Sequence, residues 1–387
     1  MNIEYVYLLF ALVAPALLWR VDDSFKGGRS GVGSSVEGST KAIHTMDVVV
    51  PARNEENSLP DLLTSLSGQL LASTLLSVTV VDDHSSDSTV KIANSFGVNV
   101  VSANELQRSY NPKSNALATY QSQLKGDVVV FLDADVTLLD EEFLDKLRAA
   151  QLASEGCLIS VQPYHRCGSI YESLALFPNL MALMGSGAFS IWNPRHHSKV
   201  AFGPVLCVAK SAYKKVGGHR RIVKEVLDDA GLAQSFLSSG YEVKVFAGSR
   251  GVAFRMYPEG IRQLVQGFTK NLAPGALRTS LVSTTLSVLW VVGFLGSSAA
   301  LLSQLGSGAL LSPSLTAIAG VAVFVFMVET YLFGRKIGRY SPIWYLLSPL
   351  ALLFFLSLFI GSFVKVYLAR SISWKDRSIS LRESSCD

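Results

Sequence analysis

The chain is long enough for a complete catalytic domain with additional segments, and its composition points toward a membrane. It has 387 residues, of which 49% are hydrophobic and only 17% are charged, and its mean hydropathy of +0.34 is high for a soluble enzyme. The net charge of +4 is modest and the sequence shows no Lys/Arg run or RNA-binding motif, which argues against a nucleic-acid partner. The four cysteines lack C-x-x-C spacing, so we predict reduced thiols in a cytosolic domain.

The amino-terminal segment Ile3–Trp19 is apolar apart from one glutamate and is followed by Arg20 and Lys26. A secretory signal carries its positive charge before the apolar core, so this order indicates an anchor whose carboxyl end faces the cytoplasm. The segment is close to the lower limit of about 17 residues for a membrane span, so an interfacial helix is the alternative. We assign residues 1–20 to this anchor and the Gly/Ser-rich residues 21–44 to a flexible linker.

Three short apolar runs in the next part of the chain are typical of buried strands: Met46–Val50, Val78–Val81 and Val128–Leu132. Each run ends in a polar loop that contains carboxylates. In an open α/β sheet, ligands bind beyond the carboxyl ends of the strands, so we expect these loops to line one crevice. The pattern therefore predicts an α/β domain with a ligand site at one edge of its sheet.

The third run delivers Asp133 and Asp135 into its loop. Side chains alternate along an extended segment, so residues two apart point the same way. Both carboxylates are then expected to face one point, which suits a hard divalent ion that also holds phosphates. A solvated acidic turn is the alternative for this pair alone, and the two neighbouring loops favour the site.

The motifs VVVPARNEE, VVDDHSSDST and FLDADV, in this order, resemble the family-2 glycosyltransferases. The resemblance covers Thr45–Gly275 and implies the GT-A fold, a Rossmann-like mixed sheet that binds nucleotide-sugars. Four further motifs, SVQPYH, AFGPV, GGH and VAFRMYPEG, are most similar to the membrane-bound bacterial carotenoid glycosyltransferases of the 4,4'-diaponeurosporenoate type. The hopanoid-associated glycosyltransferases are a looser match. We therefore expect an α/β GT-A domain at residues 45–278 with flanking transmembrane helices.

The resemblance implies a donor site for a UDP-sugar and a divalent ion, Mg²⁺ or Mn²⁺. Asp135 is expected to bind the ion directly, and Asp133 to contact the ion, the ribose or the sugar. Asp82 or Asp83 corresponds to the carboxylate that accepts a hydrogen bond from the base. Lys113 corresponds to a basic position near the base and the diphosphate, with an exposed loop lysine as the alternative. The family's first nucleotide-binding loop corresponds to Pro51, Ala52, Arg53 and Glu55.

By the same resemblance, Asp228 and Asp229 match an acidic pair that opens a helix and supplies the base of an inverting displacement. The helical pattern that follows aligns Asp229 with the catalytic base, and Asp228 is the alternate. Two acids at a helix start also favour the helix dipole, which is the purely structural explanation for the pair. Because an ordinary aspartate is ionised at pH 7, we expect this base to need placement and no unusual pKa.

Two further segments bear on the acceptor. Processive polysaccharide synthases of this family carry Gln-x-x-Arg-Trp after the base, whereas Gln263–Phe268 lacks the Arg-Trp pair, which argues against a polymerase. Tyr171–Trp192 is long and apolar and is interpreted first as a core helix. An acceptor groove or an interfacial helix is the alternative for this segment, because methionine and aromatic side chains make adaptable apolar surfaces.

The carboxyl-terminal part explains most of the hydropathy. Residues 279–328 hold no charged side chain, which is enough for two membrane spans with a turn near Gln304–Ser314. Arg335 and the lysine after it mark a cytoplasmic loop. A third uncharged run, Ser341–Val364, is either a span or an interfacial hairpin, and the basic residues beyond it favour the cytoplasmic side. We assign residues 279–370 to transmembrane or interfacial helices and residues 371–387 to a basic tail.

The sequence therefore predicts a multi-pass enzyme of the cell membrane whose catalytic domain faces the cytoplasm. We expect it to move one hexose, with glucose as the first choice, from a UDP-sugar to an apolar lipid of the bilayer. A carotenoid carboxylate or hydroxyl is the acceptor that the resemblance implies, and a hopanoid, a ceramide or diacylglycerol, or a polyprenyl phosphate is the alternative. A non-catalytic nucleotide-sugar-binding scaffold is the alternative from another class, but it has no need to keep Asp133, Asp135 and Asp229 together.

Overall fold

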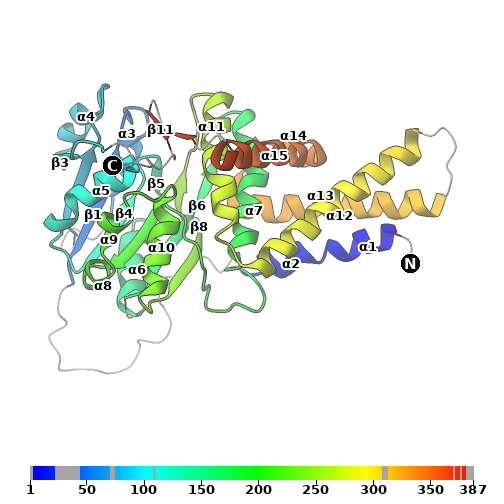
Figure 1. The fold of residues 1–387 in the computed structure, drawn as a ribbon, viewed down its shortest axis with the longest axis horizontal. Coiled ribbons are helices and arrows are strands. Elements are labelled where there is room, and N and C mark those ends of the chain that lie inside the picture. Colours follow the sequence, from blue (N-terminus) through cyan, green and yellow to red (C-terminus); the bar gives the residue numbers. More distant parts are fainter. Residues whose placement is uncertain are drawn as a thin grey trace. The chain divides into compact units, whose positions relative to one another are not determined.

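The computed structural model describes residues 3–21, 44–69, 75–107, 110–154, 156–306, 313–368, 371–374 and 377–380. The chain forms two compact units, and their elements are labelled in Figure 1. The sheet unit comprises residues 23–164, 197–255 and 370–387, and the helical unit comprises residues 1–22, 165–196 and 256–369. Segments 165–196 and 256–278, which the sequence assigns to the catalytic domain, thus group with the membrane helices. The predicted linker at 21–44 lies outside the described residues except at its two ends.

The three apolar runs are strands, as predicted, and they belong to one mixed sheet. Its strands are β1 (Met46–Ala52), β2 (Leu75–Asp82), β3 (Asn99–Ser102), β4 (Val128–Leu132), β5 (Val136–Leu138), β6 (Leu158–Arg166), β7 (Val205–Ala209) and β8 (Val243–Phe254), in the spatial order β3-β2-β1-β4-β7-β6-β8-β5. The pairs β1–β2, β1–β4 and β2–β3 are parallel, whereas β7 joins β4 and β5 joins β8 antiparallel. This sheet confirms the predicted α/β class with a mixed sheet.

Short helices connect these strands. They are α3 (Leu59–Ser67), α4 (Thr89–Ser95), α5 (Pro112–Tyr120), η1 (Gln121–Gln123), α6 (Phe143–Leu152), α8 (Lys210–Lys215), α9 (Gly218–Arg221) and α10 (Asp228–Ser238). A separate antiparallel pair, β10 (Ser371–Trp374) and β11 (Arg377–Ser380), falls in the predicted basic tail. Because the parallel strands share one direction, the loops after β1, β2 and β4 leave the sheet at the same edge.

Strand β4 is fixed at its start by a buried carboxylate. The side chain of Asp47 in β1 is 1% exposed and accepts hydrogen bonds from the backbone N–H groups of Lys125 (2.7 Å) and Gly126 (2.8 Å). A Cβ at Gly126 would lie 2.7 Å from the backbone nitrogen of Asp47, so only glycine permits this approach. All five residues of β4 are buried, which sets the point at which Asp133 leaves the sheet.

The helical unit contains α1 (Ile3–Phe10), α2 (Val13–Leu18), η2 (Tyr171–Ala175), α7 (Leu176–Ser186), α11 (Ile261–Ala276), α12 (Leu281–Gly306), α13 (Pro313–Ile337), β9 (Gly338–Arg339), α14 (Pro342–Leu346), α15 (Ser348–Phe363) and the π-helical turn η3 (Val364–Leu368). Most of α7 is buried, as its interpretation as a core helix requires. Strand β9 pairs with the last two residues of β6, His165 and Arg166.

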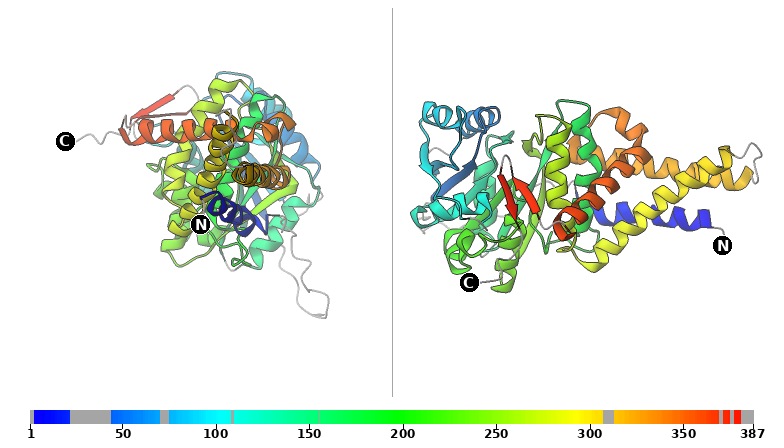
Figure 2. Two further views of the ribbon diagram at one scale, coloured as in Figure 1. Left: turned by 90° about the vertical axis from the view of Figure 1, so that its right-hand side faces the viewer. Right: turned by 45° about the horizontal axis from the view of Figure 1, so that its top comes forward.

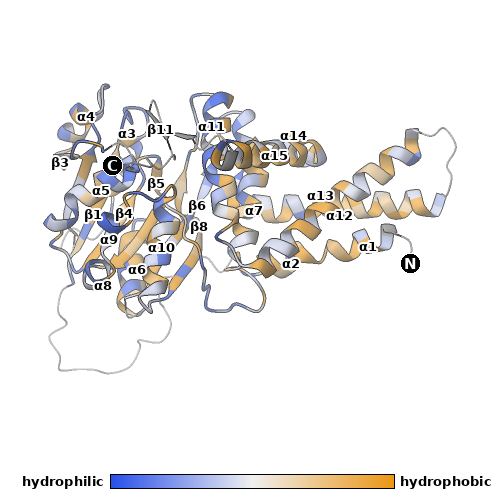
Figure 3. Cartoon of the chain, viewed as in Figure 1, coloured by the Kyte–Doolittle hydropathy of each residue, from blue (hydrophilic) through white to orange (hydrophobic). Residues whose placement is uncertain are grey.

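Three helical segments are long and apolar enough to cross a membrane: Leu281–Gly306, Pro313–Ile337 and Ser348–Val366. The apolar amino-terminal segment, Tyr5–Leu18, is shorter. Figure 3 shows the hydrophobic residues that cover α12, α13 and α15. Helix α13 runs past Val328, the last residue of the charge-free stretch, and the buried carboxyl group of its Glu329 accepts a 2.9 Å hydrogen bond from Trp290 of α12. The centre of the predicted turn at Gln304–Ser314, residues 307–312, lies outside the described residues.

The third apolar helix does not run beside the other two. Figure 2 shows α12, α13 and α1 side by side, with α15 running across them. α15 packs against α11 and α7, and its Ser362 hydroxyl accepts a 2.9 Å hydrogen bond from the backbone nitrogen of Ala273 in α11. The opposite face of α15 exposes Leu350, Leu353 and Ile360 at helical spacing.

Candidate functional site

A single lysine lies among three aspartates at the edge of the sheet where the parallel strands end. The Nζ atom of Lys113 is 2.6 Å from Oδ1 of Asp133 and 3.3 Å from Oδ2 of Asp228. The Lys113 side chain is only 15% exposed, and Asp229 is close enough to act on its charge. The structure thus brings together four residues that the sequence proposed separately, from three different segments.

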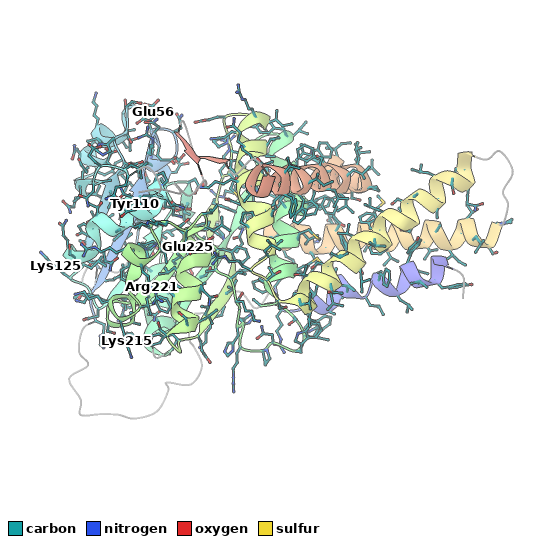
Figure 4. The ribbon with its side chains drawn as sticks, in the orientation of Figure 1. Glu56, Tyr110, Lys125, Lys215, Arg221 and Glu225 are labelled. Carbon is teal, nitrogen blue, oxygen red and sulfur yellow. The ribbon has the colours of Figure 1, made fainter. Side chains whose placement is uncertain are left out.

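The backbone around Asn111 brings these segments together. Asn111 is the N-cap of α5, and its side-chain oxygen accepts a hydrogen bond from the nitrogen of Ser114 (3.2 Å). Its amide group donates to the carbonyl oxygens of Glu225 (3.1 Å) and Val226 (3.0 Å), in the loop that leads into α10. Figure 4 labels Tyr110 and Glu225, which mark these two segments. One capping residue therefore places Lys113, near the start of α5, opposite the acids at the start of α10.

Gly203 forms the remaining wall of the cluster. A Cβ at this position would lie 3.1 Å from Nζ of Lys113 and 3.4 Å from Oδ2 of Asp229. The loop is held by Ser160, whose hydroxyl accepts from the nitrogen of Phe202 (2.7 Å) and donates to its carbonyl oxygen (3.0 Å). The AFGPV and SVQPYH motifs therefore meet here, and glycine at position 203 lets the backbone approach the lysine and Asp229 more closely than a residue with a side chain could.

Charge and burial shift the proton affinities of the cluster. Burial alone would lower the pKa of Lys113, but the carboxylates of Asp133 and Asp228 raise it above its ordinary value, so this lysine stays charged. For Asp229, burial and then the neighbouring Asp228 carboxylate raise the pKa to about 7, against the opposing effect of Lys113. The expectation of an ordinary pKa for the predicted base is wrong, because the acid lies in a half-buried group of like charges.

Asp133 and Asp135 lie in a turn between two strands. Strand β4 ends at Leu132, and the nitrogen of Val136 donates a 3.2 Å hydrogen bond to the carbonyl oxygen of Asp133. The reasoning from an extended strand is therefore wrong for this pair, because the chain has already turned. Asp133 contacts Lys113, and the carbonyl oxygen of Asp135 accepts from the nitrogen of Arg255 (3.2 Å).

The carboxylates of this turn fit a divalent ion in number and type. Within the part of the chain that the structure describes, no three His, Cys, Asp or Glu side chains gather as a complete metal site. Mg²⁺ and Mn²⁺ sites at nucleotides take one or two protein carboxylates, and phosphate oxygens and water supply the other ligands. Asp135 and Asp133 provide that number of oxygen ligands, although Asp133 would have to exchange its contact with Lys113.

The predicted nucleotide loops after β1 and β2 are joined directly to each other. The guanidinium group of Arg53 donates to the carbonyl oxygens of Asp83 (2.6 Å) and His84 (3.2 Å). The carbonyl oxygen of Ala52, which follows Pro51 at the end of β1, accepts from the nitrogen of Asp83 (2.8 Å). Beyond them, the nitrogen of Glu55 donates to the hydroxyl of Thr89 (2.8 Å). The two loops therefore form one rigid edge beside the end of the sheet.

The GGH motif has a packing role next to strand β4. His219, in the GGH motif, is fully buried, and its Nδ1 atom lies 2.6 Å from the hydroxyl oxygen of Tyr213. Its ring packs edge-on against Phe131 of β4 at 4.9 Å between centroids. Burial lowers the pKa of His219 to about 4, so the ring is neutral at pH 7. Sequence reasoning used this motif for resemblance only, and its spacing gives no sign of this packing role.

Comparison with known proteins gives consistent results. The model of the glycosyl transferase family 2 matches residues 47–180. A protein from Staphylococcus haemolyticus named 4,4'-diaponeurosporenoate glycosyltransferase is 32% identical over 365 residues, which is 89% of this chain and 91% of the relative. The protein of the same name from Staphylococcus aureus (strain USA300) is 31% identical over 339 residues, which is 87% of this chain and 88% of the relative.

Solved structures of two glycosyltransferases are also similar. Glucosyl-3-phosphoglycerate synthase from Mycobacterium tuberculosis, in complex with Mn²⁺, UDP and phosphoglyceric acid, is 22% identical, with 65% of this chain and 84% of that chain covered and a TM-score of 0.41. A mannosyltransferase from Pyrobaculum calidifontis, in complex with GDP-mannose and Mn²⁺, is 17% identical, with 85% and 99% covered and a TM-score of 0.47.

Proposed function

The chain belongs to glycosyl transferase family 2, and we propose that it is a membrane-bound inverting glycosyltransferase that moves a hexose from a UDP-sugar to an apolar lipid. The observation that carries this proposal is the cluster of Lys113 with Asp133, Asp228 and Asp229 at the carboxyl edge of the sheet. A donor diphosphate needs cationic groups, and an inverting displacement needs a base on the far side of the anomeric carbon. Both kinds of group converge here.

In this proposal Asp229 is the base and Asp228 its alternate. A carboxylate with a pKa near 7 is a stronger base than an ordinary aspartate and still loses its proton at physiological pH. Asp229 takes the proton of an acceptor hydroxyl as the oxygen attacks the anomeric carbon, and the bond to the diphosphate breaks on the opposite side. Gly203 keeps a side chain out of the position between base and lysine, because a Cβ there would lie 3.1 Å from Nζ of Lys113 and 3.4 Å from Oδ2 of Asp229.

Charge at the leaving group is supplied by Lys113 and by the acidic turn. Asp135, with Asp133, would hold Mg²⁺ or Mn²⁺, which when bound neutralises charge on the diphosphate. Lys113 is already charged and close to Asp133, so a short movement of its flexible side chain would bring it to a phosphate oxygen. The rigid edge formed by Arg53, Asp83 and the β1 loop would hold the nucleoside.

A lipid acceptor is supported by the helices and by the relatives, whose name refers to diaponeurosporenoate. We propose a carotenoid carboxylate or hydroxyl as the acceptor and glucose as the sugar. We also propose that α12 and α13 span the membrane, with Arg335 and Lys336 at the cytoplasmic end. We further propose that α15, which runs across α12 and α13, lies in the membrane interface, so that the basic tail stays on the cytoplasmic side as its charges favour.

The proposal is tested with the full chain in lipid nanodiscs. The protein is incubated with one UDP-sugar at a time, Mn²⁺ and a lipid extract that contains carotenoid acids and alcohols. The masses of the lipids are then measured by mass spectrometry. We expect one lipid to gain a single hexose mass with the wild type and none to do so with Asp229→Asn. A growing water-soluble glycan would contradict the lipid acceptor, and metal-dependent UDP binding without any transfer or hydrolysis would point to the scaffold instead.

A further inference from the structure

A histidine at the end of β2 adopts a backbone conformation that side chains rarely take. His84 has a φ of +54°, in the left-handed region where glycine is unstrained and other residues are uncommon. It follows Asp82 and Asp83 directly and therefore lies at the edge of the sheet where ligands bind in open α/β folds. Strain of this kind persists where the surroundings enforce it and is frequent at functional sites.

The two carboxylates beside His84 are turned inward. Asp82 is 5% exposed and Asp83 1% exposed. The Asp82 carboxylate accepts from the nitrogen of Ser85 (3.2 Å), and Asp83 lies against Arg53, with 3.9 Å between the guanidinium nitrogen and Oδ2. In contrast, the side chain of His84 is 39% exposed. Of these three adjacent side chains, the imidazole of His84 is therefore the one most available to a ligand.

The folded protein makes little use of this imidazole. Its Nε2 atom lies 4.0 Å from a carboxylate oxygen of Glu105, whose side chain is 97% exposed. An ion pair this exposed to water contributes little to the stability of the fold. The backbone conformation does have a use, because the carbonyl oxygen of His84 accepts from Arg53 (3.2 Å), but glycine would provide that equally well. The other strained residue of this edge, Asn54 (φ +51°), differs, since its side chain accepts from the nitrogen of Ser86 (2.9 Å).

We propose that His84 recognises the nucleoside part of the donor, with its imidazole ring lying against the base. The inference rests on the proposed function, because it assumes that a nucleotide binds at this edge. A flat ring suits a base, since ring stacking needs no particular hydrogen-bond pattern. The hydrogen bond from Arg53 to the carbonyl oxygen of His84 fixes the backbone that carries the ring, which lowers the entropy cost of ordering it on binding.

The test uses calorimetry on the full chain in nanodiscs with Mn²⁺ and four ligands: UDP, UMP, uridine and pyrophosphate. His84→Gly is the sharper variant because it keeps the backbone conformation and removes only the ring. We expect His84→Gly to weaken the binding of UDP and of UMP by the same factor, fivefold or more, and to leave the binding of pyrophosphate unchanged. The melting temperature of the protein should rise. His84→Phe should retain most of the UDP affinity. His44→Ala is the matched control, because His44 is 43% exposed and 3.6 Å from Asp127 just before the opposite end of β1.

The outcomes separate this inference from the proposed function. Equal UDP affinity in the wild type and His84→Gly would overturn the role of His84 while leaving the enzyme assignment intact. A loss that extends to pyrophosphate would overturn it too, because the contact would then be with phosphate. If His44→Ala loses as much UDP affinity as His84→Gly does, the effect is not specific to His84, and the inference is rejected. If the wild type binds none of the nucleotides, the proposed function fails and this inference fails with it.

Discussion

Replacing Lys113 with glutamine tests how the charge cluster controls the base. The substitution removes the cation that contacts Asp133 and Asp228 and leaves three carboxylates to share one half-buried space. Burial and Asp228 raise the pKa of Asp229, to about 7, while the charge of Lys113 and the hydrogen bond from the nitrogen of Ala230 oppose them. Without Lys113, the pKa of Asp229 should rise further. Lys113→Arg keeps the charge and is the matched control.

The size of the effect follows from the geometry around Gly203. Nζ of Lys113 and Oδ2 of Asp229 lie within 3.1 Å and 3.4 Å of one point, so the two atoms are at most about 6.5 Å apart. With an effective dielectric of about 20, unit charges at that distance interact by roughly 2.6 kcal/mol, or about two pKa units. Since the cluster is partly exposed, we expect about half of this. Loss of one partner of a buried ion pair should also destabilise the fold by roughly 3 kcal/mol.

The assay is the pH dependence of kcat/KM for transfer to an alcohol acceptor between pH 5 and 9, in a buffer of constant ionic strength. In the wild type the rate should fall tenfold per pH unit below about pH 7, because Asp229 becomes protonated there. In Lys113→Gln this fall should begin about one pH unit higher, and in Lys113→Arg it should not move. A uniformly slower Lys113→Gln enzyme with the same midpoint would refute the reasoning and assign the lysine to the donor alone.

Three other substitutions probe the same site. Asp229→Asn should leave UDP affinity within a few-fold and reduce transfer by a factor of about 10² to 10⁴; if Asp228→Asn does so instead, the assignment of the base shifts by one residue. Asp135→Ala should remove the metal dependence of UDP binding, measured by calorimetry with Mn²⁺ and with EDTA, and unchanged titrations would reject Asp135 as a ligand. Gly203→Ala places a methyl group 3.1 Å from the Lys113 nitrogen, so kcat should fall about tenfold with little change in melting temperature, whereas unaltered kcat would mean that the space is not used.

The free energy of unfolding should also depend on pH through Asp229, and the direction of this dependence follows from its raised pKa. Because the pKa of Asp229 is raised in the folded protein to about 7, from about 3.9 in the unfolded chain, protonation favours the folded state. The stabilisation is complete below about pH 4 and is lost as the pH rises through 7. The site is therefore held in an unfavourable charge state at the pH where it works, which is a common property of catalytic groups.

The sequence was informative where local pattern decides the structure. The apolar runs ending at Val50, Val81 and Leu132 correspond to strands β1, β2 and β4, because a buried parallel strand needs a continuous apolar run. The charge-free stretch that indicates two spans stops at Val328, whereas helix α13 continues to Ile337. A carboxyl group in an apolar helix normally marks its end, but Glu329 is accommodated by a hydrogen bond from Trp290, and that partner lies far away in the sequence.

Contacts between distant loops could not be deduced from pattern. Nothing in the spacing of Lys113 and Asp228 indicates that Asn111 joins their segments, since periodicity identifies the face of an element and not the loop that it will meet. The pKa of Asp229 is likewise a property of its assembled surroundings, in which burial and like charge add together. The resemblance singled out these residues as candidates, and only the three-dimensional arrangement shows how their charges affect each other.

The charge of the cluster bears on the chemical form of the acceptor. A hydroxyl keeps its proton at pH 7 and needs a base, whereas a carboxylic acid with a pKa near 4 has already lost it. An ionised acceptor would enter a space in which three aspartates face one lysine, so it would be repelled unless Asp229 were protonated. The two acceptors therefore predict opposite pH dependences around pH 7: transfer to a hydroxyl rises with pH, and transfer to a carboxylate falls. Because the pKa of Asp229 is about 7, both of its forms are populated near that pH, and the direction of the pH dependence distinguishes the two acceptors.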